Sequence, residues 1–454
     1  MRGLALLAMG CAAAYAHIGS PDVFHEGAAG PYPLFVAIRT PAAIPGVAEV
    51  EIRTAASDID SIRITPIPLT GDAAKFAPTA DVTFRSPDDP QFFRGALWMM
   101  TAGSWQVRIE VEGARGKARL SIPVPAAARS TLAMTPGLGI ILAILGMVLA
   151  AGVVSLVGAA GRESRLAPGA AASSDDLRRG KRWMAIAAGA VVCVLLLGNQ
   201  WWELEANAYG NYIYKPLAMA AGVDGNRLTL QLNDPGWLRS RRMDDFIPDH
   251  NHPMHLFVVR LPELDRIWHL HPDEAGPGEF AHNLPDMPAG RYQLYADVVH
   301  ANGFPETMTA ELELPAAIVG KALEGDDSGA VPATGVTLVP EPGGWMARKP
   351  YRFRVKVTDA REMELYMGMP GHAVFLKKDR SVYAHVHPTG SAPMAALALT
   401  EEARNDPHSA HWMAPLGDTV SFPYAFPSPG AYRVYAQIKR KGQVETATFD
   451  IDVQ

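Results

Sequence analysis

Two long apolar stretches constrain this chain more than any other feature of its sequence. Residues 137–160 carry no charge over 24 positions, and about 20 apolar residues are enough for a helix to cross a bilayer. Residues 183–202 form a second run that begins at Trp183 and ends at Trp202, and tryptophan is enriched where helices meet the membrane–water interface. The sequence therefore predicts two transmembrane α-helices with soluble parts before and after them.

The charges between these stretches predict an orientation. Residues 161–182 contain six Lys or Arg against three Asp or Glu, and short cytoplasmic loops are enriched in basic side chains. Residues 1–16 have the form of a signal peptide, with an apolar core and a small-x-small end. We expect 161–182 to be a cytoplasmic loop of an inner (cytoplasmic) membrane protein, whose N-terminal and C-terminal domains lie in the periplasm or outside the cell.

Short β-rich runs separated by proline and glycine turns fill the soluble parts. Each part also has a Gly-x-aromatic step before its penultimate run, at Trp105, Tyr292 and Tyr432, which we interpret as an anchor of a sandwich edge. We predict an all-β fold of three immunoglobulin-like β-sandwich domains, besides the signal peptide and the two helices. The sandwiches cover residues 17–126, 203–319 and 336–454, with a linker at 320–335.

A histidine-rich pattern occurs twice in the last two soluble parts. Residues 250–255 read HNHPMH and 269–272 read HLHP, while 367–372 read MGMPGH and 385–388 read HVHP. Aligned on their prolines, the copies offer five histidines in the first, and three histidines with two methionines in the second. Imidazole and thioether are neutral ligands that copper accepts, and thioether favours Cu(I).

Hairpin geometry predicts that each copy gathers three imidazoles. If the two runs of a copy pair about the turn between them, the first histidine lies opposite the last, and the middle one lies diagonal to both. The expected triads are His255, His269 and His271 in the first copy, and His372, His385 and His387 in the second. We expect His250 and His252 to close over the first triad, and Met367 and Met369 to complete the second.

Copper is the predicted metal, and zinc is the alternative for the all-histidine first copy, where four nitrogens suit a tetrahedral ion. Cleavage after residue 16 would leave His17 as the mature N-terminus, where its amine and imidazole could chelate copper or simply remain at the surface. His282 and His300 have no counterpart in the second copy, so we expect them to be surface residues.

Other classes of function find little support in the sequence. Cys11 lies in the predicted leader and Cys193 in an apolar run, so metal in the soluble parts must be held by His, Met or carboxylate. A net charge of -6 argues against a nucleic-acid partner. No constellation of catalytic acid, base or nucleophile stands out, and we predict that the chain is not an enzyme.

The C-terminal half resembles YtkA-like and FixH-related extracytoplasmic domains. The resemblance spans residues 225–454 and rests on the segments GHAVFL, HVHP and PGAYRV. It implies small immunoglobulin-like modules associated with oxidases and copper. The N-terminal domain, which opens HIGSPDVF at His17, is similar in outline to CopC-type copper-resistance proteins, in which a mature N-terminal histidine binds Cu(II).

These observations predict a membrane-anchored extracytoplasmic metal-binding protein that handles copper or delivers it to an envelope enzyme, with a metalloenzyme or oxidase as partner. The alternative is an immunoglobulin-like scaffold or interaction protein of the cell envelope that binds no metal. In that case the histidines pack across strands and the methionines fill the core, because such sandwiches host many unrelated roles.

Overall fold

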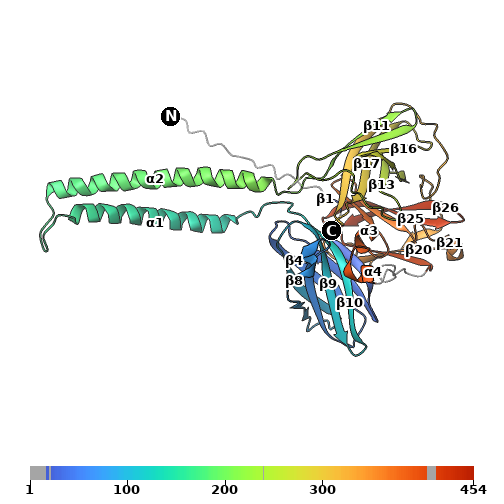
Figure 1. Cartoon of the computed structure of the whole chain (residues 1–454), viewed down its shortest axis with the longest axis horizontal. Coiled ribbons are helices and arrows are strands. Elements are labelled where there is room, and N and C mark those ends of the chain that lie inside the picture. The colour runs from blue at the N-terminus through green and yellow to red at the C-terminus, as the bar shows by residue number, and fades with distance from the viewer. Residues whose placement is uncertain (1–16, 20–21, 239, 406–415) are drawn as a thin grey trace. The chain divides into compact units, whose positions relative to one another are not determined.

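The computed structural model describes residues 17–19, 22–238, 240–405 and 416–454 (Figure 1). The predicted signal peptide, 1–16, lies outside the described residues. The chain divides into two compact units, one made of Met1–Ala128 with Lys215–Gln454 and the other of Arg129–Tyr214. The first unit is built of β-sheets and the second of helices.

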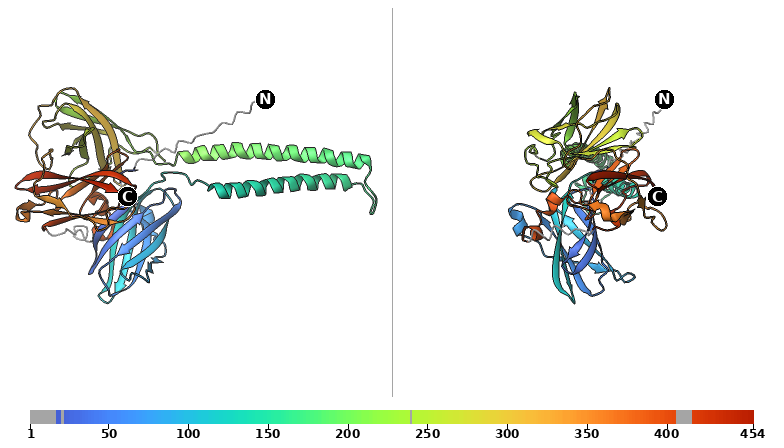
Figure 2. Two further views of the ribbon diagram at one scale, coloured as in Figure 1. Left: turned by 180° about the vertical axis from the view of Figure 1, so that it is seen from behind. Right: turned by 90° about the vertical axis from the view of Figure 1, so that its right-hand side faces the viewer.

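The helical unit contains α1 (Pro136–Glu163) and α2 (Ser174–Gly210), which lie side by side in Figures 1 and 2. Both are long and apolar enough to cross a membrane. The predicted loop 161–182 is wrong in its bounds, because only 164–173 connects the helices. Ser173 and Asp176 form a capping box, which starts α2 before its apolar run and makes the basic residues part of the helix.

Glycine lets the two helices approach each other near Gly161. A Cβ at this position would lie 2.9 Å from Cβ of Trp183, whereas a Cβ at Gly152 would meet no atom within 4 Å. We expect Gly161→Leu to cost about 1–3 kcal/mol through overpacking, and Gly152→Leu to cost little. Unfolding of the full chain in mixed detergent micelles, followed by tryptophan fluorescence, measures the difference. Equal effects of the two variants would contradict this packing.

The N-terminal part of the β-rich unit folds into two facing sheets. Buried aliphatic side chains from both sheets form one core. The first sheet has the order β10 (Gly116–Ala126), β9 (Gly103–Gly113), β5 (Ile59–Pro68) and β6 (Asp81–Val82). The second has the order β2 (Val23–Ala29), β3 (Tyr32–Arg39), β4 (Gly46–Arg53), β8 (Phe92–Met99) and β7 (Phe84–Arg85).

The first histidine-rich repeat also consists of two sheets around a core of its own. The predicted start at 203 is wrong, because α2 continues to Gly210 and the first strand begins at Ala218. One sheet has the order β11 (Ala218–Asp224), β12 (Arg227–Asn233), β16 (Glu279–Asn283) and β15 (Asp273–Gly276). The other has the order β14 (Ile267–Leu270), β13 (His255–Leu261), β17 (Gly290–Val299) and β18 (Pro305–Leu314).

The second repeat has the same plan, with short helices α3 (Met394–Leu397) and α4 (Glu401–Asn405) after its histidine hairpin. Its smaller sheet has the order β19 (Val336–Leu338), β20 (Tyr351–Val357) and β24 (Thr419–Tyr424). The larger sheet contains β23 (Val382–Val386), β22 (His372–Lys377), β25 (Gly430–Arg440), β26 (Gln443–Val453), β21 (Met363–Glu364) and β1 (His17–Ile18). The backbone of His17 pairs with Val382, and its side chain lies outside what the structure describes.

The aromatic anchor occurs in all three sandwiches. Trp105 Nε1 donates to the carbonyl four residues earlier at 3.0 Å, and the hydroxyls of Tyr292 and Tyr432 donate to the equivalent carbonyls at 2.6 and 2.8 Å. This confirms the interpretation of the Gly-x-aromatic step as a structural anchor, and its recurrence supports a common plan for the three sandwiches.

The sheets that carry the histidine hairpins are buried on both faces. Along β13, Leu256 and Val258 enter the core of the first repeat, whereas Phe257 and Val259 pack against the second repeat. The second repeat contributes Val374, Leu376, Tyr383 and Tyr435 to this shared apolar layer. Side chains alternate between the faces of a strand, so a continuous apolar run such as LFVV fits a strand covered on both sides.

The N-terminal sandwich joins the second repeat through β2. The N–H of Glu26 donates to the carbonyl of Thr389 at 2.8 Å, and the N–H of Ser391 donates to that of Phe24 at 2.9 Å. His25 lies between these contacts and is 6% exposed. Burial lowers the pKa of His25 to about 4 from its ordinary 6.5. The imidazole of His25 is therefore neutral in the folded protein at neutral pH.

His25 should therefore make the fold sensitive to acid. Its folded pKa lies below its unfolded pKa, so the unfolded chain takes up the proton first and stability falls as the pH drops from about 6.5 to about 4. The contribution is about 3 kcal/mol at 1.36 kcal/mol per pKa unit. We expect His25→Leu to remove this part of the slope in urea unfolding at a series of pH values. An unchanged slope would show that His25 is not buried neutral.

Candidate metal centre

The two histidine hairpins have the register predicted from the sequence. Leu256 pairs with Leu270 and Phe257 with His269, while Val374 pairs with His385. Each hairpin brings three histidines together, with one ligand atom from each lying within 4.8 Å of the others. The triads are His255, His269 and His271, and His372, His385 and His387.

The two triads form one cluster, whereas the sequence had suggested two separate sites. His255 and His372 lie on the strand faces that carry Phe257 and Val374, which are the faces where the repeats meet. His385 consequently lies 5.7 Å from His255 and 5.8 Å from His269 between ring centroids. The sequence treats each hairpin alone, and only the packing of one repeat on the other brings their histidines into contact.

The turn before β13 sends its two histidines to different triads. His250 and Asn251 have φ of 49° and 70°, and Asp249 pairs with His252 across the turn. The ring of His252 stacks on that of His271 at 3.9 Å, as expected for the first triad. His250 instead lies with the second triad, 5.2 Å from His372 and 4.9 Å from His387 between ring centroids. His250 also lies 6.0 Å from His255 of the first triad between ring centroids, so it borders both triads, and its role as a ligand stays a prediction.

The two predicted methionine ligands occupy the matching turn of the second repeat. Tyr366 pairs with Met369 across this turn, as Asp249 does with His252, and Met367 has a φ of 49°. Met369 is buried. The alignment of the two turns made from the sequence is confirmed, and the role of the two sulfur atoms as ligands stays a prediction.

The hydrogen bonds of the first triad fix where its protons lie. Nε2 of His255 lies 3.0 Å from the carbonyl of Asp249, which can only accept. The hydroxyl of Tyr366 donates to the carbonyl of Asp326 at 2.8 Å, so it accepts from Nδ1 of His269 at 3.1 Å. A neutral imidazole has one N–H. The remaining nitrogens, His255 Nδ1 and His269 Nε2, lie 2.9 Å apart, and both have free lone pairs when the two rings carry their protons in this way.

The second triad repeats this arrangement. Nε2 of His372 lies 3.2 Å from the carbonyl of Tyr366, and Nδ1 of His385 lies 3.5 Å from a carboxylate oxygen of Asp297. Nδ1 of His372 and Nε2 of His385 lie 3.1 Å apart, and both lone pairs are free for a metal ion when the proton of His385 is on Nδ1, beside Asp297. Three further Nε2 atoms of the cluster are buried without a hydrogen-bond partner among the described residues, those of His250, His271 and His387.

Two opposed lone pairs repel each other unless a cation lies beside them. Burial, with the neighbouring histidines adding to it, lowers the pKa of His255, His269 and His372 well below the ordinary value, so protons are a poor source of that positive charge. Ligand nitrogens about 2.0 Å from a tetrahedral ion are about 3.3 Å apart, close to the distances found here. The donor set thus fits a transition-metal ion.

Carboxylates hold the outer nitrogens of several of these rings. Nε2 of His252 lies 3.1 Å from Asp326, and Nδ1 of His271 lies 3.0 Å from Asp327. Although burial would raise it, the pKa of Asp327 is lowered to about 2 by hydrogen bonds from His271 and His282. Histidine ligands of metals commonly donate their second N–H to a carboxylate, which orients the ring and offsets the ion's charge.

Three expectations about this region need correction. The linker 320–335 is partly built into the site, because the N–H of His269 donates to the carbonyl of Ser328 at 3.0 Å and the reverse bond is 2.8 Å. His282 is not a free surface residue, since it pairs with Asp327 at 3.2 Å. His300 is buried and pairs with Asp245 at 2.7 Å. The sequence did contain a sign that this linker belongs to the site, namely the two adjacent acids Asp326 and Asp327 within it.

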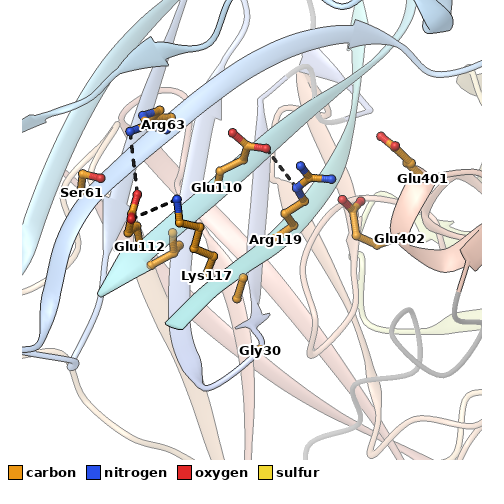
Figure 3. Close-up of a pocket in the computed structure, with 11 residues that line it drawn as sticks. Gly30, Ser61, Arg63, Glu110, Glu112, Lys117, Arg119, Glu401 and Glu402 are labelled. Atoms are coloured by element: carbon orange, nitrogen blue, oxygen red, sulfur yellow. Dashed lines mark ion pairs between the residues drawn. The ribbon is translucent and has the colours of Figure 1, made fainter. Parts of the chain in front are cut away.

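A separate groove of about 780 Å³ lies over the sheet of β5, β9 and β10 in the N-terminal sandwich, with α4 at one side (Figure 3). Its charged side chains are largely matched with one another, as in the pairs of Glu112 with Lys117 at 3.1 Å and of Glu110 with Arg119 at 3.0 Å. None of the histidines of the cluster lines it. The groove and the histidine cluster are therefore distinct features.

One family matches the last sandwich. Residues 333–454 match a family described as a domain of unknown function, DUF8832. None of the curated proteins matches the chain.

Several of the solved structures that match this chain are distant from it in sequence. They include an engineered protein (16% identity, 20% of each chain), a tetra-tandem repeat from the extending region of a large adhesion protein (8% identity, 91% of this chain and 72% of that one) and the D1–D4 ectodomain fragment of ICAM-5 (9% identity, 91% and 74%). Each has a TM-score of 0.16, which carries no functional argument. The resemblance to YtkA-like, FixH-related and CopC-type proteins stays a prediction.

Proposed function

We propose that this chain is a membrane-anchored metal-binding protein whose two C-terminal repeats hold copper. The observation that carries the proposal is the close approach of two buried histidine nitrogens in each triad, at 2.9 Å in the first and 3.1 Å in the second, beside the unpartnered Nε2 atoms of His271 and His387. A scaffold that used histidine only for packing would place a proton between the two close nitrogens. A metal ion in place of that proton would use both of their lone pairs and the unpartnered nitrogen of the third histidine.

Copper is the preferred ion because the turns of the two repeats pair imidazole with thioether donors, His250 and His252 in one and Met367 and Met369 in the other. Imidazole binds copper in both oxidation states, and thioether favours Cu(I). The all-histidine triad, with His252 stacked on His271, also suits zinc. The titration below compares the two ions directly.

The burial of the cluster favours retention of the ion over rapid exchange. His255, His269 and His372 are at most 2% exposed, while the side chain of His252 is 25% exposed. Entry or release then requires local opening, and His252 is the ligand best placed to receive an incoming ion. This fits a protein that stores copper or delivers it to an envelope metalloenzyme or oxidase upon contact.

The proposal also includes the orientation of the chain in the membrane. The basic residues of the start of α2, Arg178 to Arg182, favour the cytoplasmic side, which would put both β-rich segments of the chain on the outer face of an inner membrane. The histidine cluster would then meet metal outside the cytoplasm, where free thiols are oxidised and imidazole and thioether ligands persist.

Titration of the full chain in detergent micelles with copper(I), against a chromophoric chelator and without oxygen, tests the proposal. We expect two equivalents to bind, and His271→Ala and His387→Ala each to remove one. Parallel titrations with zinc decide which ion each triad prefers. His300→Gln, which changes a histidine whose partner Asp245 holds none of the triad histidines, is the matched control and should keep both equivalents. Absence of saturable binding would overturn the proposal and leave the scaffold interpretation.

A further inference from the structure

The second triad is open toward the first repeat, and one histidine of that repeat enters it. Asp249, His250 and His387 each offer a ligand atom, and these atoms lie within 4.8 Å of one another. The ring of His250 stands at 70° to that of His387 and at 76° to that of His372. Its Nε2 is buried and has no hydrogen-bond partner among the described residues.

The residues that orient the triads also cross between the repeats. Asp297 of the first repeat, paired with His255 in the sheet, lies 3.5 Å from Nδ1 of His385 in the second. Gln437 occupies the equivalent position beside His372, and its Oε1 accepts from Nδ1 of His269 at 3.2 Å. Each repeat thus holds the middle histidine of the other, so neither triad has its observed geometry without its partner.

We propose that His250 is the fourth ligand of the second triad, so that a single ion is bound by both repeats and fastens them together. This rests on the proposed function. The second site would hold four imidazoles, three from its own hairpin and one from the turn of the neighbouring repeat. That ion would then take ligands from both repeats, whereas all three histidines of the first triad come from one hairpin.

A double-mutant design on the full chain separates the two sites. His271→Ala leaves the second site to be measured alone, and His387→Ala leaves the first. Into each background we place His250→Asn, because residue 250 has a φ of 49° and asparagine tolerates the left-handed region. The matched control is Asn251→Gly in the same turn, an exposed residue with a φ of 70°.

We expect His250→Asn to weaken copper binding at least about tenfold in the His271→Ala background, as loss of a metal-supporting residue does, and to change it less than twofold in the His387→Ala background. Pulsed EPR of the copper(II) form of the second site should lose one coordinated imidazole. Asn251→Gly should change neither the copper affinity of the second site nor that of the first. Thermal unfolding without metal shows whether each variant is folded.

The outcomes distinguish this inference from the proposed function. If the unsubstituted chain binds two ions and His250→Asn leaves both affinities and the imidazole count unchanged, the bridging role of His250 is wrong and the two triads stand as separate three-histidine sites. If the unsubstituted chain binds no ion, the proposed function itself fails.

Discussion

Loading both triads with copper(I) is expected to raise the free energy of unfolding of the β-rich unit by about 5 kcal/mol. An ion that binds only the folded state, present at a hundredfold excess over its Kd, contributes about 2.7 kcal/mol, and there are two sites. The gain requires that the ion bind only the folded chain, and this condition fits the triads because each is assembled by the pairing of two strands. Urea unfolding of the full chain with and without copper measures it.

The variant that combines His271→Ala with His387→Ala is the control for this prediction. This double variant should show little copper-dependent stabilisation, so its free energy of unfolding should be nearly the same with and without the ion. If copper stabilised this variant as much as the unsubstituted chain, binding would be occurring elsewhere on the surface. Removal of copper by a membrane-impermeant chelator should return the unsubstituted chain to its metal-free stability, slowly, because most of the ligands are buried.

Replacement of Phe257 with alanine is expected to destabilise the fold by about 3–5 kcal/mol, the usual cost of deleting a buried phenyl group. The ring is fully buried in the layer between the repeats, stacked on His269 at 4.0 Å and 4.8 Å from His385 between centroids. Because the ring packs against a histidine of each triad, we also expect both copper affinities to fall by about tenfold or more, as for other residues that orient ligands.

Phe280→Ala is the matched control for the Phe257 variant. Phe280 is also buried, but it lies in the core of the first repeat, away from the shared layer. It should lower the free energy of unfolding by a similar amount and leave copper affinity unchanged in the folded protein. An equal loss of affinity in both variants would mean that general instability, and not the position of the histidine rings, controls binding.

The sequence predicted the local structure of the site well. Alternation along short strands and the spacing of the histidines gave the register of both hairpins, and with it the two triads. The alignment of the repeats located the turns that carry His250 and Met367. These features follow from contacts close in sequence, where the two-residue period of a strand leaves few choices. The apolar runs predicted both long helices for the same reason, and missed the start of α2 because a capping box begins that helix before its apolar run.

The tertiary structure decided which histidines share a site. Nothing local to the first repeat indicates that His250 turns toward His387, or that Asp297 and Gln437 exchange partners across the repeats. The unbroken apolar runs LFVV and AVFL do indicate strands that are covered on both faces. They do not indicate which part of the chain covers the second face. The partner of each sheet is decided by packing, because the second face of the sheet in one repeat is buried against the sheet of the other repeat. The residues in contact are more than a hundred positions apart in the sequence. The sequence by itself determined the histidines and the hairpins that carry them, and the packing of one repeat on the other determined that they form a single cluster.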